Sequence, residues 1–367
     1  MSIENVNQPR PVSPVRVIDV TRPGRELLVE VDAAEAAELL LSIATFNAVD
    51  DLESLELGGA RIEEIRSATP PELLAQAAEL LPEKTSAMLL GLVYTTPKPR
   101  TAAAFLEHLA SIDPVELRLH LLGYYMRSHH VVDPDVLKRA AEGDDAAIAE
   151  LVEVTAEYVD SDKCMQLEAA VRADPAENKQ ALLALLTGWA EHVLPQTSPD
   201  FLALAERDAE AKRELIKAVP PEQVVEKVTR GIQWTPTPDV DRVVLFPAYA
   251  ARPWVYMSEY KRVKIFCPPI TADRKSLPGD DPAALVRVYK ALADESRLKL
   301  LRRLQEGPIS LADAAKEVGL AKSTTHHHLA ILRQAGFVLI REGDDTYSLR
   351  SDLRPEPGAL LEHYLGA

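Results

Sequence analysis

Residues 290–343 read KALADESRLKLLRRLQEGPISLADAAKEVGLAKSTTHHHLAILRQAGFVLIREG, and this stretch contains a dense series of helix and turn signals. Ser310 is a typical amino-terminal cap, since its hydroxyl can accept a hydrogen bond from the first turn of a helix. Gly319 marks a tight turn after that helix. A further helix then follows over Lys322–Gln334, and Gly336 is the left-handed residue expected after its end.

The flanking residues extend this pattern on both sides. A helix beginning at 282 and a second over Ser296–Glu306 precede the turn. Phe337–Arg341 and Thr346–Arg350 alternate between apolar and polar residues around Glu342–Asp345, which predicts a β-hairpin. The sequence therefore predicts a winged helix-turn-helix over 282–350, with the hairpin as its wing.

The helix over Lys322–Gln334 is expected to be the recognition helix, which lies in the major groove of DNA. Leu329 and Leu332, with Thr325 one turn earlier, form its inward face. Hydroxyl groups, imidazole rings and flanking cations on the other side suit hydrogen bonding to base edges and phosphates. This outward face is expected to carry Lys322, Ser323, His326, His327, Ala330 and Arg333.

Two parts of this segment resemble the signatures of the ArsR-type winged helix regulators. KALADESRLKLL at 290–301 is similar to the first signature of that family, and STTHHHLAILRQAGFV at 323–338 to its recognition helix and wing entry. The resemblance covers about 65 of the 367 residues and implies a homodimer that binds double-stranded DNA as a bacterial or archaeal repressor. From the helix face and the resemblance together we predict DNA contacts by Lys322, Ser323, Thr324, His326, His327, Arg333 and Arg341.

Four departures from the family pattern qualify what the resemblance implies. Metal-sensing members carry cysteines before the turn, whereas Ile309–Ala314 reads ISLADA. The terminal dimer helix of the family is reduced to about Gly358–Leu365, and the wing tip Glu342–Asp345 is acidic, which would repel phosphate. Ala321 stands where a capping Ser or Thr is usual. We therefore expect a regulator that is not a cysteine-based metal sensor.

The run His326-His327-His328 does not predict a metal site. Three consecutive helical residues point about 100° apart, so their rings cannot converge on one ion. Cys164 and Cys267 are far apart in the sequence and form no ligand pair. We predict no metal and no cofactor.

The region before residue 271 is predicted to be a helical domain with a small β-sheet. Asp32 and Glu35 form a predicted capping box ahead of a long helical run. Further helices are expected over about Pro70–Leu81, Thr101–Ile112, Val115–Arg127, Pro134–Glu142, Asp144–Val159, Cys164–Arg172, Pro175–Val193, Ser198–Val219 and Glu222–Thr229. Strands of one small sheet are expected at Val15–Val20, Glu26–Val31, Val240–Phe246, Pro253–Met257 and Val263–Phe266.

The predicted fold class is mainly α (α+β), with a C-terminal winged helix-turn-helix. The predicted parts are 1–270, a linker at 271–281, the winged helix at 282–350 and a tail with a short helix at 351–367. The aromatic cluster Phe246, Tyr249, Trp254, Tyr256, Tyr260 and Phe266 could form the sheet core, a domain interface or the wall of an effector pocket. Phe246–Met257 also has a faint resemblance to large ArsR-like regulators, which implies a sensor or oligomerisation role.

Charge and composition limit the classes of function. The net charge of −16 belongs entirely to 1–280, because residues 281–367 hold 12 Lys and Arg against 12 Asp and Glu. An acidic N-terminal body would repel DNA, so DNA contact is expected in the C-terminal part alone. The chain shows no export signal, no membrane span and no disulfide framework, which indicates the cytoplasm.

The sequence favours a transcriptional regulator over other classes. It holds no phosphate-binding glycine loop, nucleophile elbow or HExxH motif, so no enzymatic activity is expected. The N-terminal domain is expected to sense an effector, either a small molecule or a protein, or to set the oligomeric state. The acidic wing motivates an alternative, a protein-interaction module whose winged helix no longer binds DNA.

Overall fold

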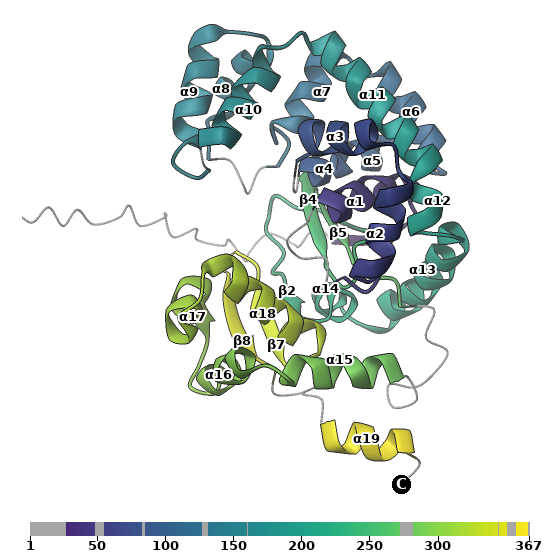
Figure 1. Ribbon diagram of the computed structural model, residues 1–367, viewed down its shortest axis with the longest axis vertical. Coiled ribbons are helices and arrows are strands. Elements are labelled where there is room, and N and C mark those ends of the chain that lie inside the picture. The colour runs from purple at the N-terminus through teal and green to yellow at the C-terminus, as the bar shows by residue number, and fades with distance from the viewer. Residues whose placement is uncertain are drawn as a thin grey trace, which may run out of the picture.

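A computed structural model of the chain describes residues 27–47, 55–82, 85–126, 131–159, 161–271, 282–343, 345–350 and 357–365. The fold is mainly helical with small sheets, as predicted, and ends in the helix-turn-helix region (Figure 1). The predicted strand Val15–Val20 and the predicted linker after Thr271 lie outside the described residues.

The N-terminal part consists of helices and five short strands within the described ranges. Its helices are α1 (Glu35–Asn47), α2 (Gly59–Ala68), α3 (Pro71–Leu80), α4 (Thr85–Met88), α5 (Leu90–Thr95), α6 (Ala102–Ser111), α7 (Pro114–Leu121), α8 (Pro134–Ala141), α9 (Asp145–Thr155), α10 (Ser161–Arg172), α11 (Pro175–His192), α12 (Leu194–Thr197), α13 (Phe201–Ala218) and α14 (Pro221–Thr229). Its strands are β1 (Leu28–Val31), β2 (Ile232–Gln233), β3 (Arg242–Leu245), β4 (Tyr256–Tyr260) and β5 (Val263–Cys267).

The C-terminal part contains α15 (Pro282–Leu292), α16 (Glu295–Leu304), β6 (Ile309–Ser310), α17 (Leu311–Val318), α18 (Lys322–Gln334), β7 (Val338–Arg341), β8 (Thr346–Leu349) and α19 (Pro357–Leu365). One sheet has the order β1-β3-β5-β4, with β4 antiparallel and the other pairs parallel. The second has the order β2-β7-β8-β6, so a strand of the N-terminal part joins the wing. The sequence did not predict this second arrangement.

Helix α1 forms the centre of the N-terminal core. Leu39, Leu40, Leu41 and Ile43 have no exposed surface, so the helix is enclosed on all sides, and its apolar residues are spread around its whole circumference. The Trp189 indole N–H donates to the Ser42 hydroxyl at 2.9 Å, and this bond satisfies both buried polar groups. The Trp189 side chain itself has no exposed surface and is part of this core.

The predicted capping box at Asp32 and Glu35 is wrong. The Asp32 carboxylate forms an ion pair with Arg100, and the Glu35 carboxylate accepts from the Ala102 backbone amide at 2.9 Å. Both groups therefore hold the loop before α6 instead of the first turn of α1. The reason is tertiary, because the cation of Arg100 is 68 residues from Asp32 in the chain.

Helices α8, α9 and α10 form a separate unit with a small core of their own, beside α7 and α11 (Figure 1). The carboxylate of Asp113 caps α7 by accepting from the Val115 backbone amide at 2.9 Å. At the other end of α7, the His120 ring stacks on Tyr260 of β4, with ring centroids 5.6 Å apart and planes 5° apart. Helix α7 therefore connects the sheet with the α8–α10 unit.

Burial, with smaller contributions from Lys261 and His108, lowers the pKa of His120 from 6.5 to about 4. The unfolded chain takes up this proton near pH 6.5, whereas the folded chain does so only near pH 4. The stability that the neutral ring contributes is therefore present above pH 6.5 and is lost as the pH falls towards 4, on the order of 3 kcal/mol in total.

We expect His120→Phe to flatten the loss of stability between pH 6.5 and 4. The measurement is the free energy of unfolding in urea at several pH values. His192→Phe replaces an exposed histidine and serves as the matched control. An unchanged pH slope in His120→Phe would contradict the assignment.

Candidate nucleic-acid interface

The recognition helix α18 is positioned by its inward face. Thr325, Leu329 and Leu332 have no exposed surface and pack in the core of the winged helix. The Thr325 hydroxyl donates to the Ala321 carbonyl at 3.0 Å, and no side chain caps the helix at Ala321. The predicted inward face is thus confirmed, as are Ser310 as the cap of α17 and the positive φ of Gly319 and Gly336.

The first turn of α18 faces solvent. Lys322, Ser323 and Thr324 are all exposed, so their polar groups are open to a partner. Arg341 is exposed at the end of β7, where the wing begins. These four of the predicted DNA contacts are therefore on the surface of the protein.

The middle of α18 lies against the N-terminal part. The ring of Trp254 stacks on His326, with centroids 6.3 Å apart and planes 15° apart, and lies 5.9 Å from His327. Both histidines are only half-buried, because the indole covers one side of each ring. The two residues predicted to read base edges are therefore partly occupied by a contact within the chain.

The predicted outward placement of Arg333 is wrong. Its side chain is 6% exposed, and Nη1 donates to the Thr229 carbonyl of α14 at 2.7 Å. Burial lowers the pKa of Arg333 to about 10, so the guanidinium remains charged at neutral pH. Ala330, also predicted to face outward, is buried as well. The N-terminal part covers this end of the helix, and a single helix period cannot reveal such a contact.

Strand β2 completes the sheet of the wing. Ile232 and Gln233 pair in parallel with Ile340 and Arg341 of β7. The Ile340 and Glu342 amides donate to the Gly231 and Gln233 carbonyls, each at 2.9 Å. These bonds pair the edge of β7 that a wing hairpin otherwise presents to solvent.

Gly231 permits the close approach of the two parts. Its φ of 119° is a conformation that side chains rarely allow. A Cβ atom at this position would lie 3.0 Å from both the Val338 carbonyl oxygen and an Arg350 guanidinium nitrogen. Glycine is therefore required where the chain enters the wing sheet.

The acidic wing makes a second contact with the N-terminal part. Lys264 of β5 lies between the carboxylates of Glu259, at 2.8 Å, and Glu342. Burial lowers the pKa of Lys264, but the two carboxylates outweigh this effect and leave the pKa raised. Glu342 is thus an internal counter-ion, whereas Asp345 is exposed and Asp344 lies outside the described residues.

His328 belongs to another surface of α18. Its Nδ1 lies 3.3 Å from the Arg297 guanidinium of α16, beside the capping residue Asp294. Burial lowers the pKa of His328 more than Asp294 raises it. The three consecutive histidines therefore diverge, with only His326 and His327 beside Trp254. Among the described residues, no group of three His, Cys, Asp or Glu side chains could hold a metal ion.

Two features of this surface had only weak sequence signals. Trp254 belongs to the aromatic cluster for which core, interface and pocket roles were open, and it lies at the interface. Strand β2 has two residues, too few to show alternation, and Ile232 and Trp234 are both buried.

No membrane-spanning helix is found among the described residues.

The helix-turn-helix domain family matches residues 292–341. The chain is 38% identical to the HTH-type transcriptional regulator NmtR of Mycobacterium tuberculosis over 69 residues, 18% of this chain and 58% of that protein. It is 33% identical to the uncharacterized HTH-type transcriptional regulator YceK of Bacillus subtilis over 76 residues, 20% of this chain and 76% of that protein. It is 40% identical to the transcriptional repressor SdpR of Bacillus subtilis over 48 residues, 13% of this chain and 53% of that protein.

The chain thus spans little more than half the length of NmtR, and the helix-turn-helix domain that is matched lies in the C-terminal part. No solved structure matches the chain significantly. The matches confirm the resemblance of the C-terminal domain to ArsR-type helix-turn-helix regulators, with a large additional N-terminal region. The chain therefore belongs to the HTH-type transcriptional regulators.

Proposed function

We propose that the chain is a cytoplasmic transcriptional repressor of the ArsR type that binds double-stranded DNA and has no enzymatic activity. The observation that carries this proposal is the exposed first turn of α18, with Lys322, Ser323 and Thr324, on a helix whose opposite side is fully buried. Helices of this kind insert their amino-terminal residues into the major groove. The similarity to SdpR, a transcriptional repressor, supports the direction of regulation.

Effector sensing is assigned to the N-terminal part and not to cysteines. Cys164 and Cys267 are both buried, and Ile309–Ala314 contains no thiol.

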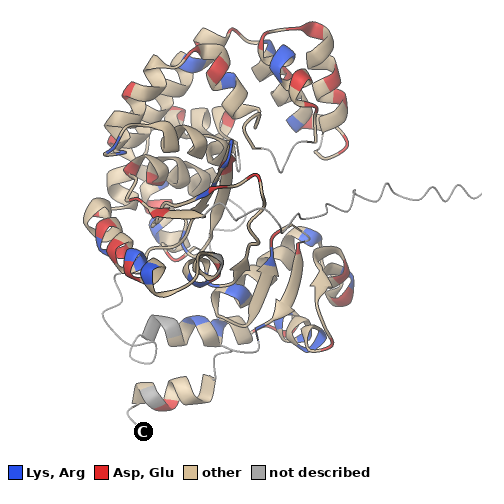
Figure 2. Ribbon diagram, turned by 180° about the vertical axis from the view of Figure 1, so that it is seen from behind, with Lys and Arg blue, Asp and Glu red and all other residues tan. Residues whose placement is uncertain are grey.

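Acidic and basic side chains are interspersed along helices of the N-terminal part, such as α13 (Figure 2). This part of the chain carries the whole net charge of −16 and is expected to stay away from the phosphate backbone.

The test is fluorescence anisotropy of the full chain on the DNA upstream of its own gene, against scrambled DNA, across a salt series. Tight, sequence-dependent binding that weakens with salt supports the proposal. Lys322→Ala should reduce the salt slope by about one and the affinity by several-fold, because one phosphate contact is lost.

Lys217→Ala is the matched control for Lys322→Ala, because it also removes one exposed cation. Lys217 lies on α13, in the acidic part that is expected to stay away from DNA, so the salt slope should stay that of the wild type. A drop in slope in Lys217→Ala but not in Lys322→Ala would contradict the placement of the DNA-facing surface.

We further propose a homodimer formed through α15 and α19. These two helices pack together, with the Tyr289 hydroxyl donating to the Pro357 carbonyl at 3.2 Å, at the end of the molecule farthest from α8 and α9 (Figure 1). Together they expose the large apolar side chains of Val286, Tyr289, Leu361, Tyr364 and Leu365. An apolar patch of this kind is typical of a self-complementary interface.

Leu361→Asp combined with Tyr364→Asp should convert the dimer into a monomer, because two charges would be buried without partners. Sedimentation velocity over a concentration series measures the change. Leu202→Asp, on the exposed side of α13, is the control and should leave the mass unchanged. A wild-type chain that is monomeric at every concentration would refute the dimer.

The alternative function, a protein-interaction module, is favoured by the wing itself. Its edge strand is already paired with β2, and its Glu342 is bound to Lys264. If the wild-type chain does not bind DNA even at low salt, this alternative is favoured.

A further inference from the structure

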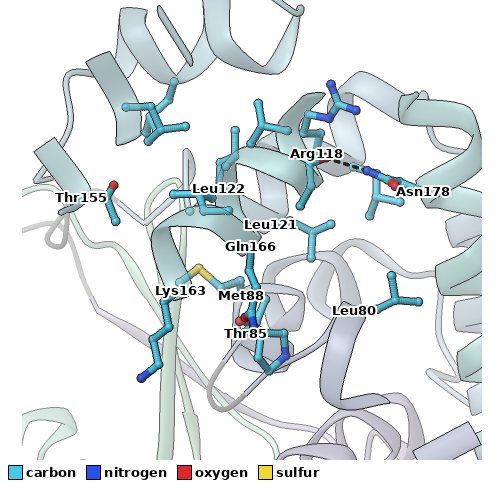
Figure 3. A pocket seen from close by; sticks show the side chains of 18 of the residues that line it. Leu80, Thr85, Met88, Arg118, Leu121, Leu122, Thr155, Lys163, Gln166 and Asn178 are labelled. Atoms are coloured by element: carbon cyan, nitrogen blue, oxygen red, sulfur yellow. Dashed lines mark hydrogen bonds between the residues drawn. The ribbon is translucent and has the colours of Figure 1, made fainter. Parts of the chain in front are cut away.

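A cavity of about 570 Å³ lies between the α8–α10 unit and the helices α7 and α11 (Figure 3). Its size falls within the usual range of small-molecule sites. The wall is largely apolar, and its apolar members include Met88, Leu117, Leu121, Leu122, Val132 and Leu167. None of the aromatic residues considered as an effector pocket in the sequence lines this cavity.

The cavity lies where two separately packed cores meet. Leu117 belongs to the main core of the N-terminal part, whereas Val132, Leu151 and Val171 belong to the core of α8–α10. Protein interiors are normally filled at the density of organic crystals, so two cores that simply merged would leave no space of this size. The apolar surfaces of both units are thus turned towards a common space.

The wall contains three cations, Arg118, Lys163 and Lys179, each with a partner within the protein, and one exposed carboxylate, that of Glu79. Arg118 donates to the Ala141 and Ala173 carbonyls, at the ends of α8 and α10, and its guanidinium points away from Leu121 and Leu122 (Figure 3). Lys179 donates to the Ala110 carbonyl at 2.6 Å, near the end of α6. These charges neutralise helix carboxyl ends, and so they hold the walls together without serving a ligand.

We propose that this cavity binds an uncharged, mainly apolar small molecule. Burial of hydrocarbon or aromatic surface against apolar walls is favourable, whereas an anionic group would lose hydration without gaining a cation that lacks a partner. Met88 and Met126 in the wall have flexible, polarizable side chains that adapt to the shape of an occupant. The volume of the site suits a small molecule, whereas a peptide would need a longer groove.

The test uses two fluorophores that differ mainly in one sulfonate group. Uncharged N-phenyl-1-naphthylamine should bind the full chain saturably, and anionic 1-anilinonaphthalene-8-sulfonate should bind roughly ten-fold more weakly, because its charge lacks a partner. Isothermal titration calorimetry measures both affinities on the wild-type protein. Equal or tighter binding of the anion, or no saturable binding of the uncharged probe, would refute the proposal.

Variants that fill the cavity locate the site. Leu121→Trp and Met88→Trp should each weaken the uncharged probe by roughly ten-fold or more, since the added ring occupies the ligand volume. Met165→Trp, on an exposed position of α10 outside the cavity, is the matched control. Unchanged affinity in both filling variants, with circular dichroism of the native fold, would place the probe elsewhere and overturn the assignment.

The covered state of α18 carries a second inference, which rests on the proposed function. Trp254 stacks on His326, Arg333 is bound to α14, and β2 occupies the edge of β7. A major groove about 12 Å wide admits a helix, but it does not admit α18 while the N-terminal part packs against the side that carries His326 and His327. We infer that the N-terminal part and DNA compete for α18, so that this contact is an autoinhibitory latch.

Glu342 allows the latch to be tested without altering the reading face. Glu342→Gln and Asp345→Asn each remove one negative charge from the wing, but only Glu342 pairs with Lys264. We expect Glu342→Gln to tighten binding of upstream DNA by roughly five-fold, and Asp345→Asn by no more than about two-fold through charge alone. Trp254→Ala, which frees His326 and His327, should tighten it as well.

The outcomes separate the latch from the proposed function. Equal gains in Glu342→Gln and Asp345→Asn, with no gain in Trp254→Ala, would refute the latch and leave the regulator standing. If neither the wild type nor any of the three variants binds DNA at low salt, the proposed function fails and the latch fails with it.

Discussion

The parallel pairing of β2 with β7 is the constraint on which the arrangement of the two parts depends. It places the backbone of the N-terminal part inside the sheet of the wing, so the winged helix is held by hydrogen bonds and not only by side chains. Parallel strands require a crossover connection, and here that connection contains the whole β3–β5 region and the winged helix from α15 to α18. The positions of Trp254 and Lys264 against the winged helix follow from this single register.

Buried or half-buried cations perform a common task in several places of this acidic chain. Arg118 and Lys179 bind helix carboxyl ends around the cavity, and Arg333 binds the carbonyl of Thr229 at the end of α14. Lys264 bridges the N-terminal sheet and the wing through two carboxylates. Each cation joins elements far apart in the chain. Removal of one partner would leave a buried charge or carbonyl unsatisfied, so these contacts define the geometry strongly.

Helix α7 links the cavity with the sheet that faces the winged helix. Leu117 and Leu121 line the cavity, while His120 stacks on Tyr260 of β4. Strand β4 pairs with β5, which carries Lys264, and Trp254 lies two residues before β4. The cavity, the sheet and the covered helix are thus joined by contiguous packed elements.

The sequence by itself determined the winged helix, because its signals are local. Capping residues, positive-φ glycines and a 3.6-residue period act within a few residues, and they placed α17, α18 and the hairpin correctly. Tertiary structure alone decided which part of the outward face of α18 is exposed and which part is covered. Arg333 and Lys322 share that face by periodicity, yet Thr229 and Trp254, about 70 to 100 residues away, bury one end of the helix and leave the other exposed. Such contacts depend on chain topology and on a two-residue strand, and neither has a periodic signature in the sequence.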